Sequence, residues 1–110
     1  MANLLEWIES IADGEEIEAV VIGEMGWPSG YGSEDVPLYS ECPKGKVISF
    51  VEARKYLDYE FSSDFGAPGC QSVWAWTETK VIAIGQYDGS TWPYYIPRNP
   101  ENKMPSMEGC

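Results

Sequence analysis

Residue types that commonly do chemistry in enzymes are sparse in this chain. It contains no histidine, which removes the commonest general base, the Ser-His and Cys-His nucleophile pairs and His-containing zinc sites. Cys70 has no residue near it in the sequence that would activate a thiol. The acid pairs Asp58/Glu60 and Glu34/Asp35 could do acid–base work, but surface acids are much commoner than catalytic ones. We therefore expect no catalytic residue and no enzymatic activity.

Binding motifs for phosphate, calcium and zinc are also missing. The segment 26–32, GWPSGYG, lacks the Lys and the Ser or Thr that follow in a phosphate-binding P-loop. The acidic stretch around it lacks the alternating D-x-D-x-D-G pattern of a calcium loop. Cys42, Cys70 and Cys110 have no metal-ligand spacing, and we expect reduced thiols. The sequence predicts no cofactor and no metal site.

The distribution of charge is more informative than its total. The net charge is −11, and all seven Lys and Arg lie at or after Lys44, whereas ten of the 18 acids precede it. Nearly all of the net charge therefore belongs to residues 1–43, which implies a partner specific to that half. Direct binding to nucleic acid is disfavoured, because phosphate contacts need Lys and Arg.

An antiparallel meander is the clearest structural signal, and any functional residues must be positioned around it. Asp88-Gly89 has the chemistry of a two-residue hairpin turn, and a weaker turn falls within residues 78–80. Pro93 cannot donate to a ladder, so the last strand should lie at a sheet edge or carry a bulge there. The predicted strands run from Gln71 to Thr77, Val81 to Tyr87 and Ser90 to Ile96, with the middle strand covered on both faces.

Two short helices and one further strand precede the meander. Asn3 caps a helix over residues 4–12, and Asp13-Gly14 ends it. A strand over residues 17–23 joins the meander, because an isolated strand could not satisfy its backbone groups. Ser49 caps a second helix over residues 50–58. Its expected apolar positions are Val51, Tyr56 and Leu57.

Together these elements predict the α+β class, with a mainly antiparallel sheet of about four strands packed against two short helices. Residues 1–97 form one domain, and residues 98–110 form a polar tail. No apolar run approaches the roughly 20 residues of a membrane span, and the N-terminus lacks the pattern of a secretory signal. We expect a cytoplasmic protein.

Two non-enzymatic functions remain open. In the first, the acidic half imitates the phosphate backbone and occupies a basic, nucleic-acid-binding surface of another protein, with aromatic side chains as anchors. The long loop over residues 24–45 supplies the anchors, unless its aromatics fold back onto the sheet. The predicted partner-binding residues are Glu9, Asp13, Glu15, Glu16, Glu18, Glu24, Trp27, Tyr31, Glu34, Asp35, Tyr39 and Glu41.

The alternative is a nucleotide-binding or small-molecule-binding module with an aromatic-lined pocket. Trp74, Trp76, Trp92 and Tyr94 would supply stacking faces for a planar ligand, although at least two of them could belong to the core instead.

Three stretches, EAVVIGEMGW, DYEFSSDFGAPG and QYDGSTWPYYIPRNP, are similar to hypothetical phage proteins. A small, acidic, histidine-free α+β chain also resembles the inhibitors that phages encode against bacterial defence, of which anti-CRISPR proteins are one class. The resemblance implies a protein of the host cytoplasm that binds a basic, nucleic-acid-binding protein of the host. It assigns no site residue, and the oligomeric state stays open.

Overall fold

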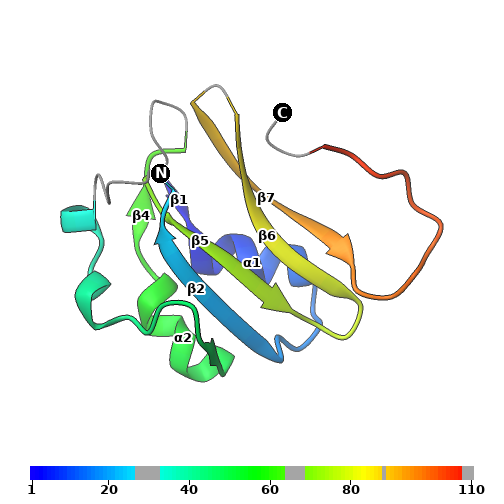
Figure 1. Cartoon of the computed structure of the whole chain (residues 1–110), viewed down its shortest axis with the longest axis horizontal. Coiled ribbons are helices and arrows are strands. Elements are labelled where there is room, and N and C mark those ends of the chain that lie inside the picture. Colours follow the sequence, from blue (N-terminus) through cyan, green and yellow to red (C-terminus); the bar gives the residue numbers. More distant parts are fainter. Residues whose placement is uncertain (27–32, 64–68, 88, 108–110) are drawn as a thin grey trace.

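A computed structural model describes residues 1–26, 33–63, 69–87 and 89–107 of the chain. Its main sheet has five antiparallel strands, and a second sheet has two (Figure 1). The order in the main sheet is β3 (Val47–Ile48), β2 (Ala19–Met25), β5 (Gln71–Trp76), β6 (Lys80–Tyr87) and β7 (Ser90–Pro97). The small sheet pairs β1 (Ala2–Asn3) with β4 (Glu60–Phe61).

The α+β class and the meander are confirmed, whereas the strand count is higher than the predicted four. The additional strands β1, β3 and β4 have two residues each. Such short segments carry too few positions to show an alternating pattern. The sequence pattern therefore does not predict them.

Both helices begin at their predicted caps; α1 ends as predicted at Asp13, and α2 ends at Leu57, one residue before the predicted end. In α1 (Leu4–Ala12) the Asn3 side chain accepts a hydrogen bond from the backbone N–H of Glu6, and Asp13 ends the helix at a φ of 51°. In α2 (Phe50–Leu57) the Ser49 hydroxyl accepts from the backbone N–H of Glu52.

One apolar position of α2 was predicted wrongly. Val51 is 83 % exposed, whereas Tyr56 and Leu57 are buried. The helix is anchored instead through the small side chain of Ala53, which is fully buried. The spacing of Ala53, Tyr56 and Leu57 is that of one helical face, which leaves Val51 on the opposite side.

The helices cover one face of the sheet. Alternate strand residues point to that face and form a single buried cluster with α1 and α2; its strand members include Val20, Ile22, Val73, Ala75 and Ile82. In Figure 1 the central strands lie in front of α1, and no helix crosses the side of the sheet toward the viewer.

The middle strand β6 was predicted to be covered on both faces, and this is correct only in part. Ile82 is buried on the helix side; on the other face Ala83 is buried and Val81 is half-buried, but no described helix covers them (Figure 1). That face is shielded by neighbouring side chains of the sheet and not by a second layer. An apolar residue on each side of a strand therefore did not mean a covering element on each side.

The hairpin between β6 and β7 has the predicted two-residue turn. Tyr87 pairs with Ser90, and Gly89 has a φ of 83°, which glycine adopts without steric cost. Asp88 lies outside the described residues. As predicted, β7 is an edge strand that contains Pro93.

The predicted loop over residues 24–45 contains two short 3₁₀ helices, η1 (Ser33–Asp35) and η2 (Tyr39–Glu41). After β7, residues 98–107 have no regular structure. Arg98 fixes the start of this segment, because its guanidinium donates to the Thr77 carbonyl and pairs with Glu18.

Candidate binding surfaces

Four of the predicted partner-binding acids line one cleft. The cleft has a volume of about 610 Å³ and lies between the C-terminal end of α1, residues 14–18 and the start of α2. Phe50 and the exposed Val51 also contribute to its wall. The four acids are Glu9, Glu15, Glu16 and Glu18.

Three of these four acids are paired with bases of the chain's own second half. Glu9 contacts Arg54 at 3.2 Å, Glu15 contacts Lys80 at 3.3 Å and Glu18 contacts Arg98 at 2.7 Å. The charge asymmetry of the sequence is therefore partly cancelled in space. Among the four, only Glu16 lacks an ion-pair partner in the described part of the chain. This pairing weakens the cleft as an imitation of a phosphate backbone.

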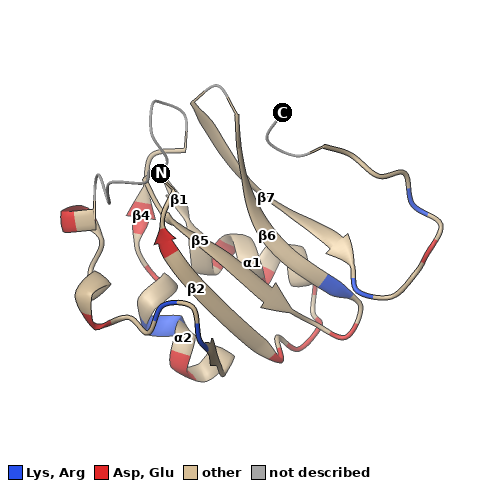
Figure 2. Ribbon diagram, viewed as in Figure 1, with Lys and Arg blue, Asp and Glu red and all other residues tan. Residues whose placement is uncertain are grey.

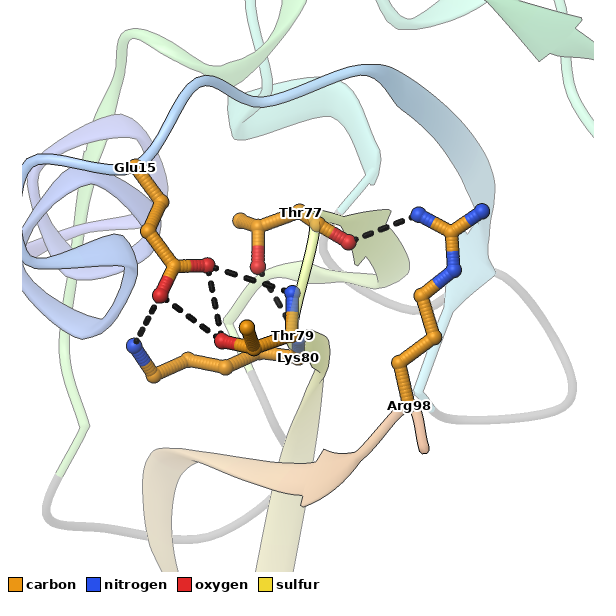
Figure 3. Close-up of polar contacts among 5 residues, drawn as sticks. All are labelled: Glu15, Thr77, Thr79, Lys80 and Arg98. Atoms are coloured by element: carbon orange, nitrogen blue, oxygen red, sulfur yellow. Dashed lines mark hydrogen bonds and ion pairs between the residues drawn. The ribbon is translucent and has the colours of Figure 1, made fainter. Parts of the chain in front are cut away.

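Glu15 also has a structural task at the turn between β5 and β6 (Figure 3). Its carboxylate accepts hydrogen bonds from the Thr79 hydroxyl at 2.7 and 2.9 Å and from the Thr79 backbone N–H at 3.3 Å. Thr77 closes the turn, because its hydroxyl accepts from the backbone N–H of Lys80. The hydroxyls of Thr77 and Thr79, followed by Lys80, lower the pKa of Glu15 from 4.5 to about 2. A turn without glycine is thus held by a distant carboxylate.

Of the other predicted acids, Asp13 borders the cleft between its lining residues Ala12 and Gly14, whereas the rest belong to other elements. Asp13 is the C-cap of α1, Glu24 lies near the end of β2, and Glu34, Asp35 and Glu41 belong to η1 and η2. Figure 2 shows the acids of η1 and η2 on the opposite side of the molecule from the segment 13–18.

The predicted aromatic anchors have two outcomes. Tyr39 packs against the core, with Lys44 Nζ 4.0 Å from the centre of its ring. This agrees with the alternative that loop aromatics fold back. Trp27 and Tyr31 lie outside the described residues.

The four aromatics of the alternative prediction lie on one face of the sheet. Trp76 pairs with Val81, Tyr94 with Ala83, and Trp92 with Gly85. Because side chains alternate along a strand, these pairings direct Trp74, Trp76, Trp92 and Tyr94 away from the helices. We call this side the open face; its other apolar members include Val21, Val47, Val81, Ala83 and Ile96.

Several side chains of the open face are strongly exposed for their type. Trp74 is 59 % exposed, Ile96 is 55 % exposed and Val47 is 73 % exposed. Figure 2 shows no charged residue along the middle of β2, β5, β6 and β7, because red and blue segments occur only near their ends. Contiguous apolar area of this kind marks an interaction site more often than scattered single residues do.

The indoles of the open face are held in defined positions. The rings of Trp74 and Trp76 meet edge to face, with centroids 6.4 Å apart. The Trp92 indole lies against Gly85, where a Cβ atom would approach it to 3.1 Å. Because Gly85 has no side chain, the Trp92 ring can lie directly on the backbone of β6 and cover it.

Among the described residues, the four aromatics of the open face do not together line one enclosed cavity. The larger cavity, of about 850 Å³, lies between α1, β7 and residues 97–106, and Tyr94 is its only member from the four aromatics. Small-molecule sites bury most of their ligand in a concave cavity. Trp74, Trp76 and Trp92 line neither of the two described cavities.

The two described thiols have structural surroundings. Cys42 and Cys70 are unpaired and buried, and burial raises both pKa values, that of Cys70 to about 12. Cys42 accepts a hydrogen bond from Gln71, whose backbone N–H donates to the Tyr59 hydroxyl at 3.1 Å. Burial also raises the pKa of Tyr59. Groups that stay protonated at neutral pH are poor nucleophiles and bases.

Within residues 1–26, 33–63, 69–87 and 89–107, no three His, Cys, Asp or Glu side chains lie close enough together to hold a metal ion. The described helices are also too short and too polar to cross a membrane. Comparison of the chain with protein-family models, with curated proteins and with solved structures finds no match.

Proposed function

We propose that this protein is a non-enzymatic binding protein that docks onto another protein through the open face. The observation that supports this proposal is the convergence of Trp74, Trp76, Trp92 and Tyr94 on one side of the sheet that no described helix covers. Trp and Tyr supply large contact areas and are enriched at the centres of interfaces.

The charge of the chain favours a basic protein as this partner. Aromatic sheet faces also bind single-stranded nucleic acid, but such sites need a positive groove along the backbone. A net charge of −11 opposes that mode and accelerates the encounter with a positively charged protein. It also opposes pairing of two copies, because the like charges would repel each other.

A basic, nucleic-acid-binding protein of a host cell fits this description and agrees with the resemblance to phage-encoded inhibitors. In the proposed complex the aromatic residues supply the contact that holds the partner. Acids such as Glu16, Glu34 and Asp35 act on encounter, since peripheral charges chiefly change association rates. The partner thus has an apolar contact patch beside its basic residues.

The first experiment captures the partner and compares two variants. Wild-type protein, Trp74→Ala and Val51→Ala are used as bait in a lysate at low salt, and the recovered protein is purified for kinetics. Both substitutions remove an exposed side chain, but Val51 lies on α2 and away from the open face. We expect Trp74→Ala to speed dissociation at least tenfold and Val51→Ala to leave it unchanged.

The opposite result would place the interface on a different surface. Loss of binding in Val51→Ala or Glu16→Lys with normal binding by Trp74→Ala would assign the interface to the acidic cleft. A single complex of two copies, with no other protein recovered, would make the open face a dimer contact instead.

A further inference from the structure

The end of β2 carries an irregularity that changes which side of the sheet its last acid faces. Ile22 pairs with Val73 and Met25 pairs with Gln71, so three steps along β2 match two along β5. Gly23 and Glu24 therefore both stand opposite Ser72, as in a β-bulge. The Ser72 hydroxyl donates to the Glu24 carbonyl at 3.3 Å and tightens the bulge.

The bulge places Glu24 on the open face. Ile22 and Met25 are both buried on the helix side, so the two residues between them point the other way. Without the extra residue, strict alternation would direct Glu24 toward the helices. Glu24 is exposed, and it faces Ser72, which precedes Trp74 by two positions on β5, about 7 Å along the strand.

Trp74 is the indole nearest to Glu24 along β5, and no described basic side chain of the protein lies over it. Described basic side chains lie over Tyr and Phe rings, such as Lys44 over Tyr39 and Lys103 over Tyr95 at 3.5 Å. Within the described residues, none lies over Trp74 or Trp76. Indole is nevertheless the best aromatic acceptor for a cation.

We propose that the open face recognises an arginine side chain of the partner, which stacks on the Trp74 indole and pairs with the Glu24 carboxylate. This inference rests on the proposed function and names the chemistry of its contact. Arginine fits better than lysine because its planar guanidinium is weakly hydrated, stacks on an aromatic face and binds a carboxylate through two parallel hydrogen bonds. Lysine offers a compact, strongly hydrated charge and loses the stacking.

The test uses tetra-arginine and tetra-lysine peptides titrated into the purified protein at 50 mM salt, with the tryptophan indole resonances followed by NMR. We expect tetra-arginine to bind about threefold tighter than tetra-lysine, because the planar, weakly hydrated guanidinium stacks on the indole more favourably than the strongly hydrated ammonium does. Trp74→Leu keeps an apolar side chain and should abolish that preference. Glu24→Gln should weaken the binding of tetra-arginine about threefold or more.

Glu52→Gln is the matched control, because Glu52 is an exposed acid in the first turn of α2, away from the open face. It should bind both peptides as the wild type does. Equal affinity for the two peptides, an unchanged preference in Trp74→Leu, or an equal loss in Glu52→Gln and Glu24→Gln would each overturn arginine recognition. If Trp74→Ala still loses the captured partner in that case, the open face remains the interface and only the arginine contact is wrong.

Discussion

At the scale of single residues, Glu15 links stability to pH. Its pKa is about 2 in the folded protein, below its ordinary value of 4.5. A carboxylate with a lowered folded-state pKa stabilises the fold fully above its ordinary pKa, and this contribution is lost as the pH falls from about 4.5 to about 2. Glu15→Gln should therefore lower the urea midpoint at pH 7, and the difference from wild type should vanish near pH 2.

Glu16→Gln provides the control for this measurement. Glu16 is the exposed neighbour of Glu15 and makes no hydrogen bond with any described residue. The urea midpoint of Glu16→Gln should equal that of the wild type at every pH from 7 to 2. A constant difference between Glu15→Gln and wild type from pH 7 to pH 2 would contradict the role of the Glu15 carboxylate.

Gly89 is the residue on which the last hairpin depends. Its φ of 83° lies in the left-handed region, which a β-branched side chain adopts only with strain. Gly89→Val should lower the free energy of unfolding by more than about 1 kcal/mol. Ser90→Val at the adjacent strand position should change it little, and equal effects of the two variants in chemical denaturation would refute this prediction.

At the scale of elements, the two helix caps should contribute unequally to the free energy of unfolding. The buried side chain of Asn3 accepts from the Glu6 N–H and also donates to Asp58 at 3.0 Å, whereas Ser49 has the cap bond alone at an exposed site. We expect Ser49→Ala to lower the free energy of unfolding by about 1 kcal/mol, and Asn3→Ala to lower it by more than about 2 kcal/mol. Urea unfolding of both variants measures the difference. If Asn3→Ala lowers the free energy of unfolding no more than Ser49→Ala does, the hydrogen bond to Asp58 adds nothing to stability.

The outer edge of β7 is protected against pairing by its prolines. Tyr87 and Ser90 flank the two-residue turn, so alternate residues from Thr91 onward direct their backbone N–H away from β6. Thr91 donates to the Ser63 carbonyl at 2.8 Å, and Pro93 and Pro97 have no N–H to offer. Prolines at an edge discourage strand addition from another molecule.

The double variant Pro93→Val/Pro97→Val restores two outward donors on β7. We expect it to associate at concentrations at which the wild type is monodisperse, as measured by light scattering. Trp74→Ala in the same background separates the two surfaces, because association through the β7 edge should survive it. Association that disappears with Trp74→Ala would instead identify the open face as the contact.

At the scale of the whole molecule, the net charge of −11 opposes compactness. The three described ion pairs are exposed or partly exposed, and each is worth only about 0–1 kcal/mol. Self-repulsion should therefore outweigh them, and salt should screen the repulsion. The thermal midpoint should rise between 20 and about 300 mM NaCl.

A variant with fewer acids tests the cause of that rise. Glu34→Gln/Asp35→Asn removes two negative charges from η1, where neither residue has an ion-pair partner among the described residues. Its midpoint should rise less with salt than that of the wild type. A midpoint that falls with salt would mean that the ion pairs dominate.

Local chemistry in the sequence determined much of the fold. The caps at Asn3 and Ser49, the stop at Asp13 and the turn glycine at Gly89 act within a few residues of themselves. Strand alternation likewise puts Trp74 and Trp76 on the same side of one strand, whichever strands pair with it. The sequence did not predict the two-residue strands or the exposure of Val51, because their pairing or burial depends on residues distant in the sequence.

Tertiary structure alone decided how the charges and aromatic rings are arranged. Acids of the first half meet Arg54, Lys80 and Arg98 across 45 to 80 residues of sequence, so a charge asymmetry along the chain did not become an acidic surface of the same extent. Pairing registers and the bulge at Gly23 and Glu24 likewise placed an acid on the open face of the sheet, where Trp74 lies. Such placements follow from strand order and register, which single-residue preferences do not encode.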